Sequence, residues 1–154
     1  MTEPTRKTVA VFCGSDYCPN RALYADIAFS TGRLLAERGY DVVTGGGLGM
    51  MSDVNKGAVH AGAKRVVSIR YCFNEGIQSP FFTEFETFNN LIDRQLMKPV
   101  VFVGDRFYQP IKEFIEMVIP EGFLSIPLDS LCDFTPTPEA AVTRIGNRLQ
   151  NGIT

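Results

Sequence analysis

The sequence predicts an α/β fold in which a parallel sheet lies between helices. Apolar, β-branched runs alternate along the chain with segments whose apolar residues recur at helical spacing. The first five elements follow the order strand, helix, strand, helix, strand, which favours parallel strands joined by right-handed crossovers. With 154 residues and 45% hydrophobic content, the chain is expected to form one domain, residues 1–154.

The first half of the chain supplies three strands and two helices. Residues 8–13 are a continuous apolar run, typical of a strand buried on both faces. A helix follows, with Asn20 as its expected N-cap and Gly39 as the glycine that ends it. Strands are expected over residues 40–44 and 65–69, with the second helix between them.

The second half has a less regular pattern. Residues 70–82 show no clear period and are expected to form a long loop near the strand ends, which is often functional. Residues 83–96 have helical spacing, and residues 99–103 read as another buried strand. The remaining elements are an amphipathic helix over residues 111–118, a short edge strand over residues 130–134 and a last helix opened by Thr137, Pro138 and Glu139.

A glycine-rich stretch after the second strand is the main candidate binding site. It contains Gly45, Gly46, Gly47 and Gly49, and Met50 and Met51 open the next helix. Glycine lets the backbone turn sharply and lets a ligand approach closely, and the N–H groups of a helix N-terminus attract an anion. We interpret the stretch as a phosphate cradle, because a tight turn without a ligand needs only one or two glycines. No Gly-Lys-Ser/Thr ending follows, so it is not a nucleoside-triphosphate P-loop.

The end of the first strand is a second candidate. Gly14, through its backbone, and Ser15 could contact a phosphate or ribose, because ligands bind where parallel strands end. A loop that only turns the chain is an equally good interpretation, and the two are left open here.

Composition argues against several classes of function. The net charge of −2 gives no electrostatic case for nucleic acid or an anionic membrane, and no apolar run could span a bilayer. The four cysteines form no CxxC motif and there is a single histidine, so no metal site is expected. Reduced thiols in a cytoplasmic protein fit this pattern best.

Several of these segments resemble the Lonely Guy family, whose members were once labelled lysine decarboxylases. The matching stretches are residues 11–15, 34–47 and 49–51, supported by residues 55–58, 61–62, 98–101 and 107–108. The resemblance implies a Rossmann-like α/β fold and a homodimer. It also implies that the decarboxylase label would be wrong and that no metal or redox cofactor is needed.

The resemblance further implies an activity on a small molecule. Members bind a nucleoside 5′-monophosphate, such as a cytokinin riboside monophosphate or AMP, and hydrolyse its N-glycosidic bond to a free base and ribose 5-phosphate. A non-catalytic nucleotide-binding or carrier protein on the same scaffold is the alternative hypothesis. A flavodoxin-like cofactor binder is a weaker one, because the sequence has no separate cofactor-loop signature.

The chain departs from the family at its second motif. Members carry an Arg-Lys pair on a helix, then a strand, then Pro-Gly-Gly-x-Gly-Thr-x-x-Glu, whereas neither the pair nor Pro-Gly-Gly follows Ile69 here. Glu84 matches the motif glutamate best, with Glu86 as the fallback, and is the candidate to stabilise a cationic ribose or activate water. An exposed acid at a helix start is the structural alternative for Glu84. No arginine can be given the second role, Arg70 and Arg94 being the nearest.

Relative to the family, a segment is missing between about Ile77 and Thr83. Its size is about one helix-plus-strand unit, on the order of 30 residues. Either the natural protein carries the segment and this sequence omits it, or the protein lacks it. The first explanation is favoured, because a sheet without an inner strand has unpaired edges and an exposed face.

Overall fold

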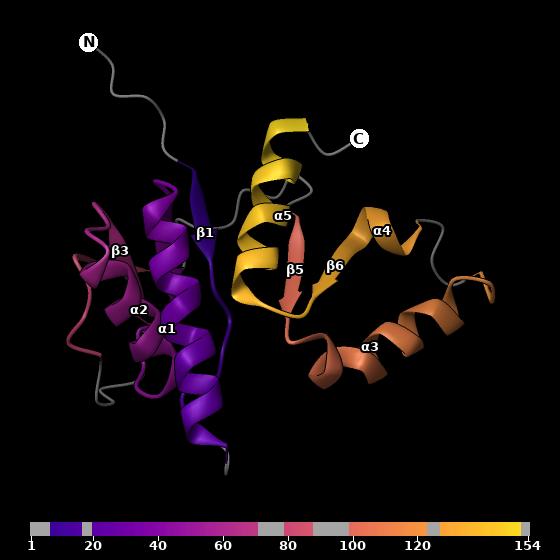
Figure 1. Cartoon of the computed structure of the whole chain (residues 1–154), viewed down its shortest axis with the longest axis horizontal. Helices are drawn as coiled ribbons and strands as arrows, with labels where there is room; N and C mark the ends of the chain where they lie inside the picture. The colour runs from indigo at the N-terminus through magenta and orange to yellow at the C-terminus, as the bar shows by residue number, and fades with distance from the viewer. Residues whose placement is uncertain (1–6, 17–19, 71–78, 88–98, 123–126, 152–154) are drawn as a thin grey trace. The chain divides into compact units, whose positions relative to one another are not determined.

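The computed structural model describes residues 7–16, 20–70, 79–87, 99–122 and 127–151, and the structural statements below concern these residues. The chain divides into two compact units, residues 1–94 and 95–154, each built from parallel strands and helices (Figure 1). The predicted α/β class with parallel strands is therefore confirmed. The single-domain organisation stays a prediction. Within the described ranges no helix combines the length and the apolar character that crossing a membrane requires.

The first unit contains a four-stranded parallel sheet with the order β1-β2-β3-β4. The strands are β1 (Thr8–Ala10), β2 (Asp41–Thr44), β3 (Val66–Arg70) and β4 (Glu84–Thr87). The two inner strands supply much of the core, since Val42, Val43, Val66 and Val67 are at most 2% exposed. Because all the strands run the same way, their carboxyl ends lie at one edge of the sheet, where the loop after β2 begins.

Two helices of the first unit, α1 (Arg21–Glu37) and α2 (Met50–His60), lie side by side (Figure 1). They approach closely at Gly32 and Gly57. A Cβ added to Gly32 would lie 1.9 Å from the Val54 carbonyl oxygen, and one added to Gly57 would lie 2.1 Å from the Phe29 carbonyl oxygen. The two backbones therefore touch at positions where no side chain fits.

The predicted boundaries of these helices agree with the structure. Asn20 precedes α1 as the N-cap, although its side chain makes no capping hydrogen bond. Gly39 follows α1 with a φ of 78°, and Gly62 follows α2 with a φ of 76°, as expected of glycines that end helices.

Two expectations about strands are wrong in this unit. The helix predicted over residues 83–96 is contradicted at residues 84–87, which form β4 with the polar–apolar alternation of a strand, and residues 88–96 fall outside the described residues. The ladder with β3 provides hydrogen-bond partners for the β4 backbone.

The run over residues 8–13 was expected to be buried on both faces, yet β1 is mostly exposed and Phe12 is 90% exposed. The reason is that β1 lies at the edge of this sheet and pairs with β2 alone among the described strands.

The second unit contains a parallel pair of strands, β5 (Val100–Val103) and β6 (Cys132–Thr135). Its helices are α3 (Asp105–Val118), α4 (Leu128–Leu131) and α5 (Pro138–Asn151). The strand expected over residues 130–134 is present as β6, with a short helix before it. The start of α5 is as predicted, because Pro138 is its first residue and the Thr137 hydroxyl accepts the Ala140 N–H at 3.3 Å.

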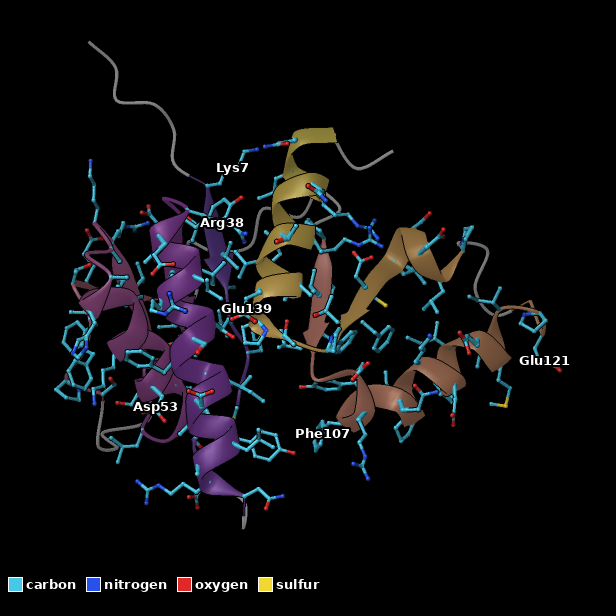
Figure 2. All side chains as sticks on the ribbon, in the orientation of Figure 1. Lys7, Arg38, Asp53, Phe107, Glu121 and Glu139 are labelled. Carbon is cyan, nitrogen blue, oxygen red and sulfur yellow. The ribbon has the colours of Figure 1, made fainter. Side chains whose placement is uncertain are left out.

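Solvent exposure in the second unit differs from expectation. β5 was expected to be buried, but Val100 is 47% exposed, since β5 pairs with β6 alone among the described strands. The amphipathic helix α3 has no buried residue. Phe107, which projects from the start of α3 (Figure 2), is 65% exposed, and Phe114 further along is 60% exposed.

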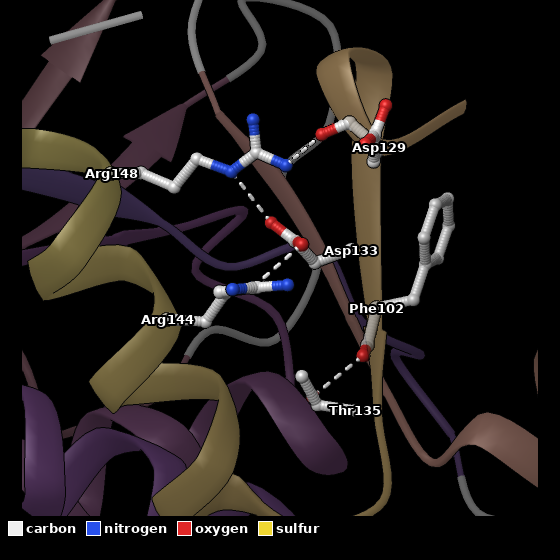
Figure 3. Close-up of polar contacts among 6 residues, drawn as sticks. All are labelled: Phe102, Asp129, Asp133, Thr135, Arg144 and Arg148. Atoms are coloured by element: carbon white, nitrogen blue, oxygen red, sulfur yellow. Dashed lines mark hydrogen bonds and ion pairs between the residues drawn. The ribbon is translucent and has the colours of Figure 1, made fainter. Parts of the chain in front are cut away.

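An acidic residue on β6 holds α5 in place (Figure 3). Asp133 is 6% exposed and accepts hydrogen bonds from Arg144 Nε at 2.7 Å and Arg148 Nε at 2.8 Å. Arg148 also donates to the Asp129 carbonyl oxygen, which ties α5 to α4. The hydrogen bond to Asp133 raises the pKa of Arg148 above its ordinary value, so the buried carboxylate keeps a charged partner.

The contact between α1 and α2 gives a prediction for Gly57→Ala. Alanine at an open helical position stabilises a protein by roughly 0.5–1 kcal/mol relative to glycine. At position 57 the methyl group would collide with the Phe29 carbonyl, so we expect a loss of about 1–3 kcal/mol in the free energy of unfolding. Urea unfolding measures the change in the free energy of unfolding, and its sign shows whether the added methyl group meets the Phe29 carbonyl. A stabilised Gly57→Ala variant would contradict the backbone contact.

Candidate functional site

The glycine loop, residues 45–49, connects β2 to α2. Gly46 and Gly49 have φ values of 72° and 63°, a region that favours glycine over other residues. The first hydrogen bond of α2 runs from the Asp53 N–H to the Gly49 carbonyl oxygen at 3.2 Å. The amides of residues 50–52 therefore precede the helical hydrogen-bond ladder, at the positive end of the helix dipole.

A buried polar cluster lies beneath this loop and connects β2, β3 and α2. The Thr44 hydroxyl donates to Asn55 Oδ1 at 3.0 Å, and Asn55 Nδ2 donates to Ser68 Oγ at 3.4 Å. Thr44 Oγ1 also accepts the Gly46 N–H at 3.1 Å. All three side chains are almost fully buried, with Asn55 at 0% exposure.

The segment that enters β4 contacts the loop from another side. The Ser79 N–H donates to the Gly46 carbonyl oxygen at 2.9 Å, and the Ser79 hydroxyl donates to Ser52 Oγ at 3.1 Å. Both polar groups of Gly46 are thus engaged within the protein. Gly46 consequently shapes the proposed cradle, while the amides available to an anion come from its neighbours.

The structure brings the two candidate segments from β1 and β2 together. A Cβ added to Gly49 would lie 2.6 Å from the Ser15 carbonyl carbon and oxygen, and one added to Gly47 would lie 3.7 Å from Ser15 Cβ. Gly14 is adjacent to Met50, whose Sδ would be 3.8 Å from a Cβ at Gly14. These residues therefore surround the start of α2, as expected for two loops at the carboxyl edge of one parallel sheet.

The side chain of Met51 lies against the glycine loop, in addition to the amide that Met51 contributes to the start of α2. Its Sδ would lie 3.0 Å from a Cβ on Gly45 and 3.5 Å from one on Gly47. The thioether therefore covers the loop backbone at Gly45, and any ligand contact from Met51 would come from its amide.

Cys13 lies beside this site but is not suited to act as a nucleophile. Burial raises the pKa of the Cys13 thiol from 9.0 to about 11, and the negative charge of Asp53, in the first turn of α2 (Figure 2), adds to the shift. Because the thiolate is the reactive form, Cys13 is almost wholly protonated and unreactive at neutral pH.

Glu84 is not brought to the glycine loop. It lies on β4 opposite Val67, and its carboxylate accepts a hydrogen bond from Arg65 Nε at 2.9 Å. Arg65 precedes β3, so the Glu84 carboxylate is directed toward the amino edge of the sheet, whereas the loop leaves the carboxyl edge. The structural alternative for Glu84, an acid at a helix start, is wrong, because Glu84 is the first residue of a strand.

Glu86 and Arg70 lie nearer the carboxyl edge. In the ladder, Glu86 is opposite Ile69, and Arg70 is the last residue of β3. Arg94 falls outside the described residues, as do residues 77 and 78, the first part of the stretch from Ile77 to Thr83 where the segment is missing. In the described part of the chain, no three His, Cys, Asp or Glu side chains are grouped so that they could hold a metal ion.

The sequence predicted the turn at the glycine loop but not the polar cluster beneath it. Asn55 falls on the helical face that Met51, Val54 and Ala58 define, so an amide among core positions was a visible signal. Ser68 and Ser79 gave no comparable signal, because nothing local distinguishes them from other serines.

Comparisons of the sequence identify related proteins. The profile of the SLOG cluster4 family matches residues 6–87, just over half of the chain. The cytokinin riboside 5′-monophosphate phosphoribohydrolase LOG of Oryza sativa subsp. japonica is 28% identical over 177 residues, which cover 90% of this chain and 72% of the rice protein. The corresponding enzyme LOG2 of Arabidopsis thaliana is 30% identical over 162 residues, with 80% and 75% covered.

The alignment with the rice protein is longer than this chain. Ninety per cent of 154 residues is about 139, so about 38 of the 177 aligned positions have no residue from this chain. That number is close to the size of one helix-plus-strand unit. The location of the missing unit near residues 77–83 stays a prediction.

Comparison of the structure finds a similar fold. The Moco carrier protein from Chlamydomonas reinhardtii superposes with a TM-score of 0.64 at 16% identity, covering 96% of this chain and 100% of that one. At this identity the likeness establishes a shared fold.

The environment of Cys13 gives a prediction about thiol chemistry. In a variant with Cys18, Cys72 and Cys132 changed to serine, we expect iodoacetamide to alkylate Cys13 at pH 8 about a hundredfold more slowly in the folded protein than in urea. The factor is the ratio of the thiolate fractions at pH 8 for a pKa of 9.0 in the unfolded chain and about 11 in the folded protein. Adding Asp53→Asn removes the smaller cause of the shift, so the folded protein should react somewhat faster. Equal rates with and without urea would contradict a partly buried, protonated thiol.

Proposed function

This chain belongs to the SLOG cluster4 family, and we propose that it is a nucleoside 5′-monophosphate phosphoribohydrolase. In this proposal the glycine loop binds the 5′-phosphate, and the products are a free base and ribose 5-phosphate. The observation that carries the proposal is the packing of Gly47 and Gly49 against Ser15 at the start of α2. The similarity to the rice and Arabidopsis enzymes supports cytokinin riboside monophosphates as the substrate class, and AMP is a second candidate that the family resemblance implies.

The phosphate has a physical reason to bind at this point. The amides of residues 50–52 precede the helical ladder, and the helix dipole stabilises a negative group there by about 0.3–1 kcal/mol, up to about 2 kcal/mol if it is partly buried. Gly47 lies beside Met51 and Ser15, and because it has no Cβ, no side chain of its own covers its backbone. The Ser15 side chain is available beside it for a phosphate or ribose oxygen.

Cleavage of the glycosidic bond additionally needs a carboxylate. The leaving base generates a cationic ribose, which a carboxylate stabilises while water attacks the anomeric carbon. The family motif ends in Thr-x-x-Glu, and the spacing from Thr83 to Glu86 reproduces it. Because Glu84 is engaged by Arg65, we propose Glu86 for this role.

A non-catalytic nucleotide-binding or carrier protein is the second candidate. The observation that favours it is the absence from this sequence of Pro-Gly-Gly and of an Arg-Lys pair after Ile69. Without a group to assist departure of the base, the same loop would bind a nucleotide and release it unchanged. The family resemblance also supports a homodimer, which sedimentation velocity tests, and the cysteine pattern supports a location in the cytoplasm.

Gly47→Ala tests the cradle. A methyl group at this position would meet Met51 and Ser15 at 3.5–3.7 Å, which are ordinary contacts, so we expect the free energy of unfolding to change by less than about 0.5 kcal/mol. The same methyl group should obstruct the backbone face, and AMP should bind at least about tenfold more weakly by calorimetry, or about 1.4 kcal/mol. Gly49→Ala is the contrasting variant, because its methyl group would collide with the Ser15 backbone and destabilise the fold. Unchanged AMP affinity in Gly47→Ala would place the ligand elsewhere.

Glu86→Gln and Glu84→Gln form a matched pair that tests the chemistry. With AMP and cytokinin riboside monophosphates as substrates, we expect Glu86→Gln to slow release of the free base by about 10²–10⁴-fold, the range typical of a lost catalytic carboxylate. Glu84→Gln should stay within about threefold of the parent, because its carboxylate is paired with Arg65. Binding of AMP without release of base by the parent protein would instead establish the carrier hypothesis.

A further inference from the structure

Asn55 is a polar residue where the fold itself does not require one. It lies on α2 with 0% exposure, at the same helical spacing as Val54 and Ala58 in the core. An amide buried without partners is costly, whereas an apolar group of similar shape among apolar neighbours is close to neutral. At this position, however, the amide faces two buried hydroxyl groups, those of Thr44 and Ser68.

The hydrogen bonds of Asn55 determine what the Thr44 hydroxyl can do. A hydroxyl group has one proton, and Thr44 donates it to Asn55 Oδ1 at 3.0 Å. The lone pairs of Thr44 Oγ1 are then left to accept the Gly46 N–H at 3.1 Å. The hydrogen bond from Asn55 Nδ2 to Ser68 at 3.4 Å fixes which end of the amide faces Thr44.

The loop has little freedom once these bonds are made. Ser79 holds the Gly46 carbonyl oxygen from the other side at 2.9 Å. A Cβ on Gly46 would lie 2.7 Å from Ser68 Cβ, so the loop backbone is pressed against β3. The orientation of the Gly46 peptide in turn sets the direction in which the backbone of residues 47–51 leaves it.

We infer that Asn55 is a positioning residue for anion binding: through the Thr44 hydroxyl it fixes the Gly46 peptide and so aligns the amides of residues 47–51. This inference rests on the proposed function, in which those amides bind the 5′-phosphate. Asn55 is buried beneath the loop, and its hydrogen bond with Thr44 connects it to Gly46.

Asn55→Leu and Val54→Ala distinguish positioning from a loss of stability. Both residues are at most 1% exposed on α2, and Val54→Ala creates a cavity without removing a side-chain hydrogen bond. Both variants should unfold at lower urea concentrations than the parent. At a temperature where all three proteins are folded, calorimetry should show that inorganic phosphate and AMP bind about tenfold more weakly to Asn55→Leu and within twofold of the parent to Val54→Ala.

Thr44→Val and Thr44→Ser provide a second test if Asn55→Leu does not fold. Serine keeps the hydroxyl group that accepts the Gly46 N–H, whereas valine has nearly the shape of threonine and no hydroxyl group. We expect Thr44→Ser to bind AMP within about threefold of the parent and Thr44→Val to bind it about tenfold more weakly.

The possible outcomes separate this inference from the proposed function. If the parent binds none of phosphate, AMP and cytokinin riboside monophosphates, both are overturned. If the parent binds AMP but Asn55→Leu or Thr44→Val binds it equally well, positioning by Asn55 is overturned and the proposed function stands. Equal weakening in Asn55→Leu and Val54→Ala would show a general effect of stability, which also overturns positioning.

Discussion

The candidate site depends on how one peptide group, that of Gly46, is held. Its N–H is bonded to Thr44, two residues before Gly46, and its carbonyl oxygen to Ser79, 33 residues after Gly46. The positive φ of Gly46 and its contact with Ser68 exclude a side chain at this point. The loop is thus defined by bonds from β2, α2 and the segment before β4, and the direction of the following amides is a consequence of those bonds.

The same constraint explains how the loop from β1 joins the site. Because β1 and β2 are parallel neighbours, both carboxyl ends lie at the same edge, and Ser15 follows β1 closely enough to pack on Gly49. Glu84 begins its strand, and its carboxylate is paired with Arg65. The position of a residue along its strand therefore separates the groups that lie beside the glycine loop from those that stabilise the opposite edge.

Features with a local signal could be predicted from the sequence. The α/β order, the ends of α1 and α2 at Gly39 and Gly62, the start of α5 and the glycine loop all follow from propensities and turn geometry that act over a few residues. The strand β4 could not be predicted in this way, because four residues inside a helix-like pattern become a strand through pairing with β3, a contact made across the fold.

The solvent exposure of the strands and the buried polar contacts could not be predicted from local sequence either. An apolar run such as residues 8–13 predicts a strand, but its burial depends on how many neighbours that strand obtains. Thr44, Asn55 and Ser68 are 11 to 24 residues apart in the sequence and meet only because α2 packs on β2 and β3. The proposed carboxylate is Glu86 and no longer Glu84 for a related reason. The partner of Glu84, Arg65, is 19 residues away in the sequence, so their ion pair has no local signal.

The glycine contacts between α1 and α2 have a mechanical consequence. Where Gly32 and Gly57 meet the opposing carbonyl groups, no side chains intervene that could change rotamer and let the helices slide. The pair should behave as a rigid body, so a force applied at the first turn of α2 is transmitted directly to α1. Any conformational change that accommodates ligands of different size would then occur in the loops, while the two helices keep a fixed position relative to each other.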